Sequence, residues 1–585
     1  AYGSAKTYTE LMNSGLYTGG WDSSIWNLPK GEAGEGYEIG LPALTGVTRP
    51  QDVVRSTWFD GGWGTADSAY GIANWGQLSN MRLLLDKHYR LNDDLDSQTS
   101  GYAQHASATA NGGAGFKPIG ADTSTPFTGT LDGQGHAISD LVVKTSGTGL
   151  VYAGLFGVVS GGAKISNLGL VNATVSASGG SHNHAGALAG LATGQTDISH
   201  SYASGGSVSV STEGSVNAGQ FTGGRAGGMV GKAAPAGVGL GAALVMTDSY
   251  ASNTVSSLGN GFNVSNYAGG LIGILDYGSV TRSYASGMVS ATGSGTTKSA
   301  GGLVGSLKFG TIEHSYASGN VSATGGNMNL AGGLTGVNGG NIFRSYAAGS
   351  VSVAGGSYNR SGGLLGSNNS GASVSQSFYA TKNAAGFDIN NGGTAAGEWS
   401  SNALGTPKTW DELKQASTFA AWGSDLATHA GSSAIWRIYD GNTLPLLRSW
   451  LKPKTVTVSV QDLPTDIEYN GAAISGSLTA SGHDGGSEVQ GDLNTSLSYS
   501  TTSKNAGTYS TQDGSLQLIG SGLYSDQQGY DIAYGLDTAL VIQPKALTVS
   551  GTTVADKTYD GNKGAEVSLG TVSGWVNDER LNIMR

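Results

Sequence analysis

The sequence predicts an all-β protein built around a parallel β-helix, and two repeated segments carry this prediction. Ala-Gly-Gly-Leu-x-Gly, or a close variant, recurs at 226–231, 268–273, 300–305, 331–336 and 361–366. Ser-Tyr-Ala-Ser-Gly, or a close variant, alternates with it, and from Tyr250 onward its aromatic residues are 30–34 residues apart. A fixed period of this size is typical of a solenoid, in which each unit buries its apolar face only against its neighbours. We therefore expect parallel rungs about 4.8 Å apart, stacked as a right-handed β-helix.

Within each rung, alternation decides which side chains face the core. Leu168 and Leu170 of the first rung are two residues apart, so both are expected to point inward. Later rungs place serine and alanine in these slots, so the tyrosine between them points outward, as does the residue two positions before it. The leucines expected to be buried in the Gly-Gly-Leu segments are Leu271, Leu303, Leu334 and Leu364. The residues expected to point outward before the aromatic residue are His200, Asp248, Arg282, His314, Arg344 and Gln376.

The segments that flank the repeats are rich in tryptophan. Five of the eleven tryptophans lie at 21–75 and five at 399–450. Because a solenoid needs capped ends, we expect these segments to close the stack. The likeness of Ile25-Trp26 to Ile435-Trp436 indicates that the chain begins with the end of a preceding unit of the same type. The predicted domains are that end at 1–71, a lead-in and cap at 72–140, the β-helix at 141–380 and a Trp-rich closing segment at 381–452.

The character of the sequence changes after Pro453. Lys454-Thr-Val-Thr-Val458 recurs 91 residues later as Lys545-Ala-Leu-Thr-Val549. Alternating β-branched residues of this kind predict strands. We therefore expect an independent β-module at 453–544 and a second, truncated one at 545–585, which together form a stalk.

Composition restricts the partners. The chain has 585 residues, with 30 Lys and Arg against 41 Asp and Glu, and a net charge of −11. A surface this poor in Lys and Arg argues against nucleic acid or anionic membranes as partners. No run of 18 apolar residues occurs, so no membrane insertion is expected. The lack of cysteine fits a chain that is exported unfolded, because a disulfide formed in the periplasm would block its translocation.

The repeats resemble the GLUG motif of large bacterial surface proteins. Lys117-Pro-Ile-Gly120 and Gly129-Thr-Leu-Asp-Gly-Gln-Gly-His136 match what precedes such repeats, and the tail resembles the MBG/YDG modules that often follow them. The combination is similar to filamentous-haemagglutinin-type adhesins of Gram-negative bacteria, although GLUG repeats also occur in immunoglobulin A metalloproteases. The resemblance implies two-partner secretion through an outer-membrane transporter partner, display on the bacterial cell surface, and attachment to host cells or biofilm polysaccharide without a cofactor.

A ladder of outward aromatic rings is the best binding candidate in the sequence. Ring faces pack against the C–H faces of sugars while neighbouring donors bond to the hydroxyl groups. The alternative is that long loops cover the ladder and that the stacking is structural. The candidate glycan-binding residues are Tyr250, Tyr284, Tyr316, Tyr346, Arg282, His314 and Arg344.

Metal-binding patterns are weak in this chain. No His-Glu-x-x-His occurs, and His182 and His184 form only a sparse pair. Asp93, Asp94 and Asp96 could bind calcium through carboxylate oxygens. A capped turn that leads into the first rung is the favoured interpretation of these three residues.

Catalytic patterns are equally weak. The core rungs offer one acidic residue each, whereas polysaccharide cleavage needs two carboxylates that converge in a groove. We therefore expect no enzyme activity. The alternatives to an adhesin are a carbohydrate-active β-helix enzyme (a polysaccharide lyase or hydrolase) and a purely structural stalk. The acidic residues considered are Asp197, Asp248, Asp276 and Glu313.

Overall fold

The computed structural model describes residues 58–214, 222–237, 241, 243–390, 405–526, 529–577 and 579. It also gives the backbone of two short antiparallel strands, β1 (Trp26–Asn27) and β2 (Ala43–Leu44). Most of the preceding unit predicted at 1–71 therefore lies outside the described residues. The chain forms two compact units, 1–413 and 414–585.

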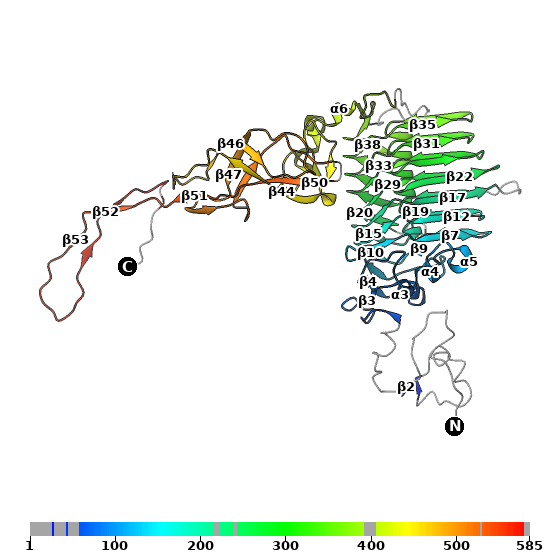
Figure 1. Cartoon of the computed structure of the whole chain (residues 1–585), viewed down its shortest axis with the longest axis horizontal. Coiled ribbons are helices and arrows are strands. Elements are labelled where there is room, and N and C mark those ends of the chain that lie inside the picture. The colour runs from blue at the N-terminus through cyan, green and yellow to red at the C-terminus, as the bar shows by residue number, and fades with distance from the viewer. Residues whose placement is uncertain are drawn as a thin grey trace. The chain divides into compact units, whose positions relative to one another are not determined.

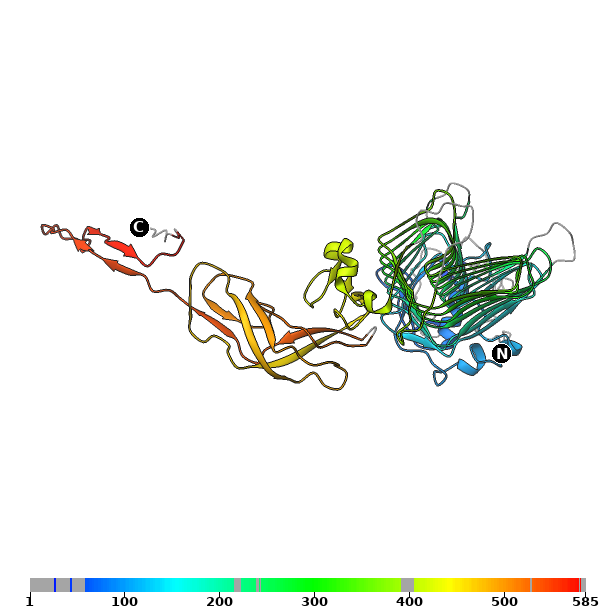
Figure 2. The same ribbon diagram turned by 90° about the horizontal axis from the view of Figure 1, so that it is seen from above.

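The first unit is a parallel β-helix, which confirms the predicted fold class (Figure 1). Corresponding strands of successive rungs pair in parallel, and equivalent residues of the repeats lie opposite one another. Tyr250 pairs with Tyr284, Tyr284 with Tyr316, and Tyr316 with Tyr346. Figure 2, seen from above, shows the rungs lying over one another. The right-handed sense of the helix stays a prediction.

The strands of the β-helix form four sheets: three columns with one strand per rung, and a larger sheet of fifteen strands. The tyrosine column holds the Ser-Tyr-Ala segments, and the valine column follows it along the chain. The tyrosine column consists of β6 (Ala137–Ser139), β11 (Gly169–Val171), β16 (Tyr202–Ser204), β21 (Tyr250–Ala251), β26 (Tyr284–Ala285), β30 (Tyr316–Ala317), β34 (Tyr346–Ala347), β39 (Phe378–Ala380) and β40 (Thr406–Lys408). The valine column consists of β7 (Val142–Ser146), β12 (Thr174–Ser178), β17 (Ser207–Glu213), β22 (Thr254–Asn260), β27 (Val289–Thr292), β31 (Val321–Thr324) and β35 (Val351–Ala354).

The third column is the asparagine column, named for its inward-facing asparagines, and it ends at the Gly-Gly corner. After this corner the chain enters a sheet of fifteen strands. Two long strands, β29 and β33, join the two halves of this sheet. The asparagine column consists of β8 (Leu150–Ala153), β13 (His182–Gly186), β18 (Gly223–Gly227), β23 (Ser265–Gly269), β28 (Thr297–Gly301), β32 (Met328–Gly332) and β36 (Tyr358–Gly362). The fifteen-stranded sheet consists of β3 (Tyr70–Ile72), β4 (His88–Leu91), β5 (Thr130–Asp132), β9 (Phe156–Val159), β10 (Lys164–Ser166), β14 (Ala189–Thr193), β15 (Thr196–Ser199), β19 (Val230–Ala234), β20 (Leu244–Thr247), β24 (Ile272–Asp276), β25 (Gly278–Thr281), β29 (Val304–Glu313), β33 (Thr335–Phe343), β37 (Leu365–Asn368) and β38 (Ser373–Ser375).

The inward residues form one continuous apolar core, as predicted. Leu168 and Leu170 are each 1 % exposed, and the leucines of the four later Gly-Gly-Leu segments are fully buried. At the Gly-Gly corners the restriction is space rather than a positive φ. A Cβ on Gly302 would lie 2.0 Å from the carbonyl oxygen of Gly333 and 2.8 Å from the Cβ of Ala317. The corner therefore admits only glycine, because neighbouring rungs approach it too closely.

A line of buried serines runs beside this apolar core. The Ser283 hydroxyl donates to the carbonyl oxygen of Thr281 (2.9 Å) and accepts from the backbone N–H of Ser249 (3.1 Å). Each hydroxyl thus bonds within its own rung and to the rung before it, so the buried polar atoms have partners. The same pair of bonds occurs at Ser201, Ser249, Ser315, Ser345 and Ser377.

Short helices and buried aromatic residues precede the repeated rungs. Asn74 caps the helix that begins at Trp75, since its side-chain oxygen accepts from the N–H of Gln77 (3.0 Å). Trp75, Leu78 and Met81 are fully buried and join the core of the β-helix. The helices are α3 (Trp75–Asn80), η2 (Met81–Leu83), α4 (Tyr102–His105) and α5 (Ala110–Gly113), with α6 (Trp410–Leu413) near the end of this unit.

The second unit has its own core and is also rich in β-structure. Tyr439 belongs to this core, and its hydroxyl donates to the carbonyl oxygen of Tyr530 (2.6 Å) and accepts from the N–H of Ile532 (2.9 Å). Part of the predicted closing segment therefore packs with the β-module, and the division into units lies at Leu413–Lys414 rather than at Lys452–Pro453.

The second unit contains a five-stranded sheet in the order β49-β47-β46-β44-β50, and a three-stranded sheet in the order β45-β51-β48. No helix among the described residues is long and apolar enough to cross a membrane. The elements of this unit are η3 (Ala416–Asp425), β41 (Leu426–Ala427), β42 (Trp436–Arg437), β43 (Leu446–Leu447), η4 (Arg448–Trp450), β44 (Lys452–Val460), β45 (Ile467–Glu468), β46 (Ser475–His483), β47 (Ser496–Thr501), β48 (Gly507–Tyr509), β49 (Leu516–Ile519), β50 (Tyr530–Gly535), β51 (Leu540–Gln543), β52 (Thr548–Ser550), β53 (Thr553–Val554), β54 (Val567–Ser568) and β55 (Thr571–Ser573).

Candidate functional site

The predicted tyrosine ladder exists as a continuous stack of rings. The ring centroids of Tyr250 and Tyr284 are 4.7 Å apart, those of Tyr284 and Tyr316 are 4.8 Å apart, and those of Tyr316 and Tyr346 are 4.9 Å apart. Their planes differ by 9° at most. These separations match the spacing of adjacent strands, so the rung repeat itself places each ring over the next.

Three of the four candidate tyrosines are covered, so they do not form the open glycan-binding surface that the candidate site requires. Tyr284 and Tyr316 are each 1 % exposed and Tyr346 is fully buried, whereas Tyr250 is half-buried. Alternation along the strand correctly assigned the rings to the face opposite the inward alanines, but it does not report what lies over that face. Burial raises the pKa of Tyr250 to about 12 and raises the pKa of Tyr284 further. The alternative of structural stacking fits these three rings.

The polar residues predicted beside the ladder are held by neighbouring side chains. Arg282 donates from Nε and Nη2 to the two carboxylate oxygens of Asp248, at 2.9 and 2.6 Å. His314 Nδ1 lies 3.2 Å from a carboxylate oxygen of Glu313. Arg344 Nε donates to the side-chain oxygen of Gln376 (3.0 Å). Bidentate pairing restrains the Arg282 guanidinium, so it is not the freely available donor that the sequence suggested.

Two of these corner residues are buried, although the sequence predicted an exposed position for them. Asp248 is 3 % exposed and His314 is 4 % exposed. The buried Asp248 carboxylate is tolerated because Arg282 neutralises it from the next rung. All six residues of this corner adopt a left-handed backbone, with φ between 45° and 49°: His200, Asp248, Arg282, His314, Arg344 and Gln376.

The acidic cluster considered for calcium is occupied by local hydrogen bonds. Asp94 Oδ1 accepts from the N–H of Ala137 (2.8 Å) and lies 3.1 Å from His136 Nδ1. Asp96 Oδ1 accepts from the N–H groups of Gln98 and Thr99, both at 2.9 Å. Asp93 joins no grouping of three potential metal ligands, and no such grouping occurs elsewhere in the described part of the chain. The capped turn is therefore the interpretation that the geometry supports.

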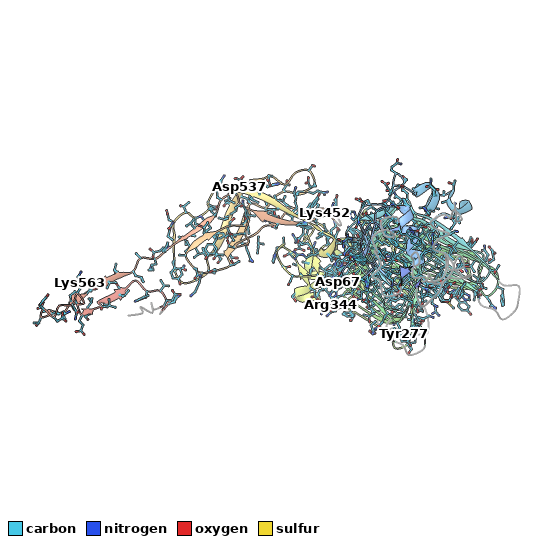
Figure 3. All side chains as sticks on the ribbon, turned by 90° about the horizontal axis from the view of Figure 1, so that it is seen from below. Asp67, Tyr277, Arg344, Lys452, Asp537 and Lys563 are labelled. Carbon is cyan, nitrogen blue, oxygen red and sulfur yellow. The ribbon has the colours of Figure 1, made fainter. Side chains whose placement is uncertain are left out.

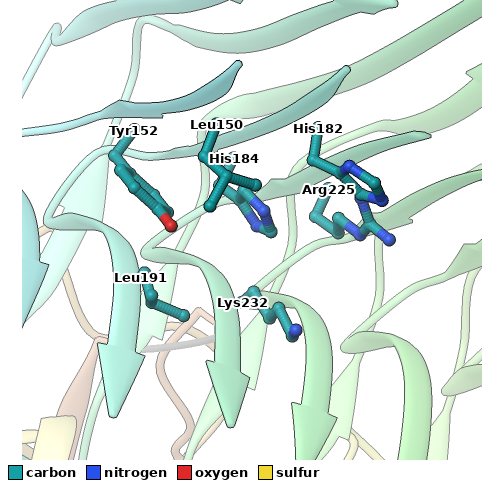
Figure 4. A pocket seen from close by; sticks show the side chains of 7 residues that line it. All are labelled: Leu150, Tyr152, His182, His184, Leu191, Arg225 and Lys232. Carbon is teal, nitrogen blue, oxygen red and sulfur yellow. The ribbon is translucent and has the colours of Figure 1, made fainter. Parts of the chain in front are cut away.

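A basic pocket lies on the outside of the β-helix, between the asparagine column and the fifteen-stranded sheet. Its volume is about 280 Å³. Figure 4 shows its lining side chains on neighbouring strands. The first wall is formed by β8, β13 and β18, and the second wall by β14 and β19. The lining residues are Leu150, Tyr152, His182, His184, Leu191, Arg225 and Lys232.

Strand register explains how residues far apart in sequence meet in this pocket. Tyr152, His184 and Arg225 occupy equivalent positions on three successive rungs of the first wall. Leu191 and Lys232 are paired on the second wall. His184 comes directly before an Ala-Gly pair, and so does Arg225, so aligning the Gly-Gly segments would have placed them in one column. Sequence analysis missed the pocket because the alternation pattern does not show that the corner turns the two walls toward each other.

Burial of cationic groups dominates the electrostatics of the pocket. His184 is 4 % exposed, and burial, followed by the charges of Arg225 and Lys232, lowers its pKa well below the usual range. Burial likewise lowers the pKa of His182, Arg225 and Lys232. Two buried atoms here, His184 Nδ1 and Arg225 Nε, have no hydrogen-bond partner among the described residues. No carboxylate lines the pocket.

A second surface feature is a pair of exposed aromatic rings on successive rungs. Tyr277 is 46 % exposed and Phe309 is 67 % exposed. Their ring centroids are 4.9 Å apart and their planes differ by 24°. Tyr277 lies at the edge of the first unit in Figure 3. Asp276 and Lys308, which precede the two rings in the sequence, are paired in register.

Comparison with known proteins gives matches in the repeat region. A profile of the GLUG motif matches residues 296–322. The chain is 33 % identical to Halomucin of Haloquadratum walsbyi over 211 residues, which is 32 % of this chain and 2 % of that protein. It is also 33 % identical over 142 residues to a protein of Evansella cellulosilytica named as a Gly-rich membrane protein, which is 24 % of this chain and 14 % of that protein. The chain thus spans only a small part of these relatives.

Among solved structures, the chain is similar to a protein of Bacteroides ovatus named as an immunoglobulin A1 protease. The sequences are 21 % identical, the TM-score is 0.41, and the likeness covers 67 % of this chain and 96 % of that one. The wider resemblance to filamentous-haemagglutinin-type adhesins stays a prediction. The comparisons confirm that residues 296–322 of this β-helix carry a GLUG motif.

Proposed function

We propose that this chain is part of a surface-displayed adhesive rod whose β-helix binds glycans through exposed aromatic rings. One observation carries the proposal: Tyr277 and Phe309 stack on successive rungs and leave ring surface open to solvent. Exposed stacked rings suit sugars, because the C–H faces of a sugar pack on aromatic rings. The relative named as a membrane protein supports a position at a cell surface.

The rigid scaffold fits this role. Parallel strand pairing and the buried serine bonds fix the distance between neighbouring rungs, so the two rings are presented at a constant separation. A single platform of this size gives weak binding, and adhesion then depends on many copies at one surface. Export through an outer-membrane transporter partner and attachment to host cells or biofilm polysaccharide belong to the same proposal, as does the expectation that the chain has no enzyme activity.

The test is a Tyr277→Ala/Phe309→Ala double substitution, scored on a glycan array and in adhesion of protein-coated beads to bacterial and host cells. We expect binding to fall by about tenfold or more, which corresponds to about 1.4 kcal/mol. Phe262→Ala is the matched control, because that ring is 75 % exposed and lies elsewhere on the same unit. Unchanged binding in a correctly folded double variant would contradict the proposal.

A purely structural rod is the second candidate, and the burial of three tyrosines of the ladder favours it. The two functions differ in the same assay. A structural rod binds no glycan in either the parent or the double variant, whereas an adhesin binds in the parent. Release of reducing ends from a polysaccharide by the parent protein would instead favour the enzyme alternative.

A further inference from the structure

We infer that the basic pocket lined by Tyr152, His184, Arg225 and Lys232 binds the carboxylate of an acidic sugar. Neither Tyr277 nor Phe309 lines this pocket, so the inference does not depend on the proposed function. It is a second, charge-selective binding site on the same β-helix. Its ligand is one carboxylated monosaccharide unit, of the hexuronic acid type, within a longer polysaccharide.

The charge of the pocket selects an anion. Two cationic side chains, Arg225 and Lys232, converge there beside the imidazoles of His182 and His184, although the chain as a whole has a net charge of −11. No carboxylate lines the pocket. Asp276 of the following rung is the acidic residue whose charge acts on the pKa of Lys232. Cationic groups held together without a lining counter-charge repel one another, and a bound anion would relieve this repulsion.

Unused hydrogen-bonding atoms give the second argument. His184 Nδ1 and Arg225 Nε are buried and have no partner within the described part of the chain. A buried polar atom without a partner costs about 1–3 kcal/mol, so native proteins rarely retain one without a reason. A carboxylate offers two acceptor oxygens and can accept from both an imidazole N–H and a guanidinium N–H.

The apolar part of the lining distinguishes a sugar acid from an inorganic anion. Tyr152 is 6 % exposed and stacks on His184, with ring centroids 5.3 Å apart. Leu191 continues this apolar surface on the second wall, and Leu150, which is 59 % exposed, lies at the open rim. A phosphate or sulfate ion gains nothing from these side chains, whereas the C–H face of a sugar ring packs against them.

The size of the pocket sets the size of the ligand. A volume of about 280 Å³ lies just below the range of typical small-molecule pockets, which begins at about 300 Å³. One monosaccharide unit matches this volume better than a longer segment does. The exposed rim at Leu150 leaves room for the polysaccharide to continue into solvent.

The direct test is calorimetric titration of the whole chain with trigalacturonate and with its fully methyl-esterified form. The ester keeps the sugar rings and removes the charge. We expect the acid to bind and the ester to bind at least tenfold more weakly. Equal binding of acid and ester would overturn the inference, and so would tighter binding of a sulfated trisaccharide or of inorganic phosphate than of trigalacturonate.

Variants place the binding in the pocket. Arg225→Gln and Lys232→Gln are each expected to weaken trigalacturonate binding at least fivefold. Lys164→Gln is the matched control, because it removes one positive charge from an exposed position of the same unit. Lys232 is only half-buried, so its variant keeps the test valid if Arg225→Gln does not fold. An equal loss in the Lys164 variant would show only long-range attraction and would overturn the assignment.

Acidification gives an independent readout. His182 and His184 are neutral at pH 7.5 because burial lowers the pKa of both, with contributions from Arg225 and Lys232. Arg225 and Lys232 also line the pocket, and Asp276 and Lys308 of later rungs act on Lys232. Burial raises the pKa of Tyr152 in the lining and of Tyr267, which is paired with Arg225, so both tyrosines stay neutral. The sugar carboxylate remains ionised at pH 5.5, and a bound carboxylate favours the protonated form of a neighbouring imidazole. Binding should therefore take up protons, so we expect trigalacturonate to bind more tightly at pH 5.5 than at pH 7.5. Weaker binding at pH 5.5 would contradict the inference.

Discussion

At the scale of single residues, the β-helix places polar groups in its interior and provides most of them with partners. Each core serine bonds to two rungs, and Asn329 bonds to Gly326, Gly355 and Asn359. Lys298 is the one charged residue among the described inward positions of the asparagine column. It lies between Asn266 and Asn329 in register, is fully buried, and its ammonium group donates one long bond of 3.5 Å to the carbonyl oxygen of Thr297. Burial lowers the pKa of Lys298 to about 8.

Replacing Lys298 with methionine is expected to stabilise the protein. A lysine in the unfolded chain has a pKa of about 10.4, so the unfolded state binds more protons than the folded state between pH 8 and 10.4. The penalty for burying the charge is therefore fully present below pH 8 and decreases as the pH rises. We expect Lys298→Met to raise the free energy of unfolding at pH 7 by about 1–3 kcal/mol.

The measurement is urea unfolding of the parent and the variant at several values between pH 7 and 10. The difference in stability is expected to shrink toward pH 10. Lys308→Met is the control, because Lys308 is exposed on the same unit and its replacement should give a small difference that does not depend on pH. If Lys298→Met destabilised the protein instead, the ammonium group would stabilise the fold, and the prediction would be wrong.

At the scale of elements, stacking in register converts a sequence repeat into ladders of identical side chains. Tyr202 lies over Gly169, where a Cβ would be 2.6 Å from the tyrosine ring, so the ladder starts where glycine leaves room for it. From there the rings continue through Tyr346, and each of the three rings between these ends stacks on a ring at both of its faces. The ladder thus buries a large apolar surface outside the main core.

Truncating a central ring of this ladder is expected to destabilise the β-helix. Tyr284→Ala would leave a cavity between Tyr250 and Tyr316 and should cost about 3–5 kcal/mol, whereas Tyr284→Phe keeps the ring and should cost less than about 1.5 kcal/mol. Thermal unfolding followed by circular dichroism checks both values. If both variants were as stable as the parent, the ladder would contribute little to the fold.

At the scale of the whole molecule, the chain consists of two units with separate cores. The apolar cluster of the second unit contains residues between Tyr439 and Ile542, and none of its members comes from the β-helix. Arg448 and Asp531 form an ion pair of 2.5 Å within this unit. The closing segment and the β-module therefore share one core, although they differ in sequence character.

A fragment of residues 414–585 is expected to fold on its own, because its core needs no residue of the first unit. A fragment that starts at Pro453 loses Tyr439, Leu446 and Leu451 from that core and should be less stable by several kcal/mol. Chemical unfolding followed by tyrosine and tryptophan fluorescence compares the two fragments. Equal stability of both would place the folding boundary at Lys452–Pro453 instead.

The sequence by itself determined the parallel β-helix, its rung period and the inward leucines and serines, because a repeat in which every unit buries the same positions leaves a periodic pattern. It also placed the tyrosines opposite the alanines, since alternation along a strand fixes the face of each side chain. Only the tertiary structure decided that Tyr284 is covered, that Asp248 is buried against Arg282, and that Tyr152, His184 and Arg225 meet Lys232 in one pocket. These outcomes depend on which strands become neighbours and on how sharply the chain turns at the Gly-Gly corner. The contacts that result join residues of different rungs, so the alternation pattern within one rung cannot predict them.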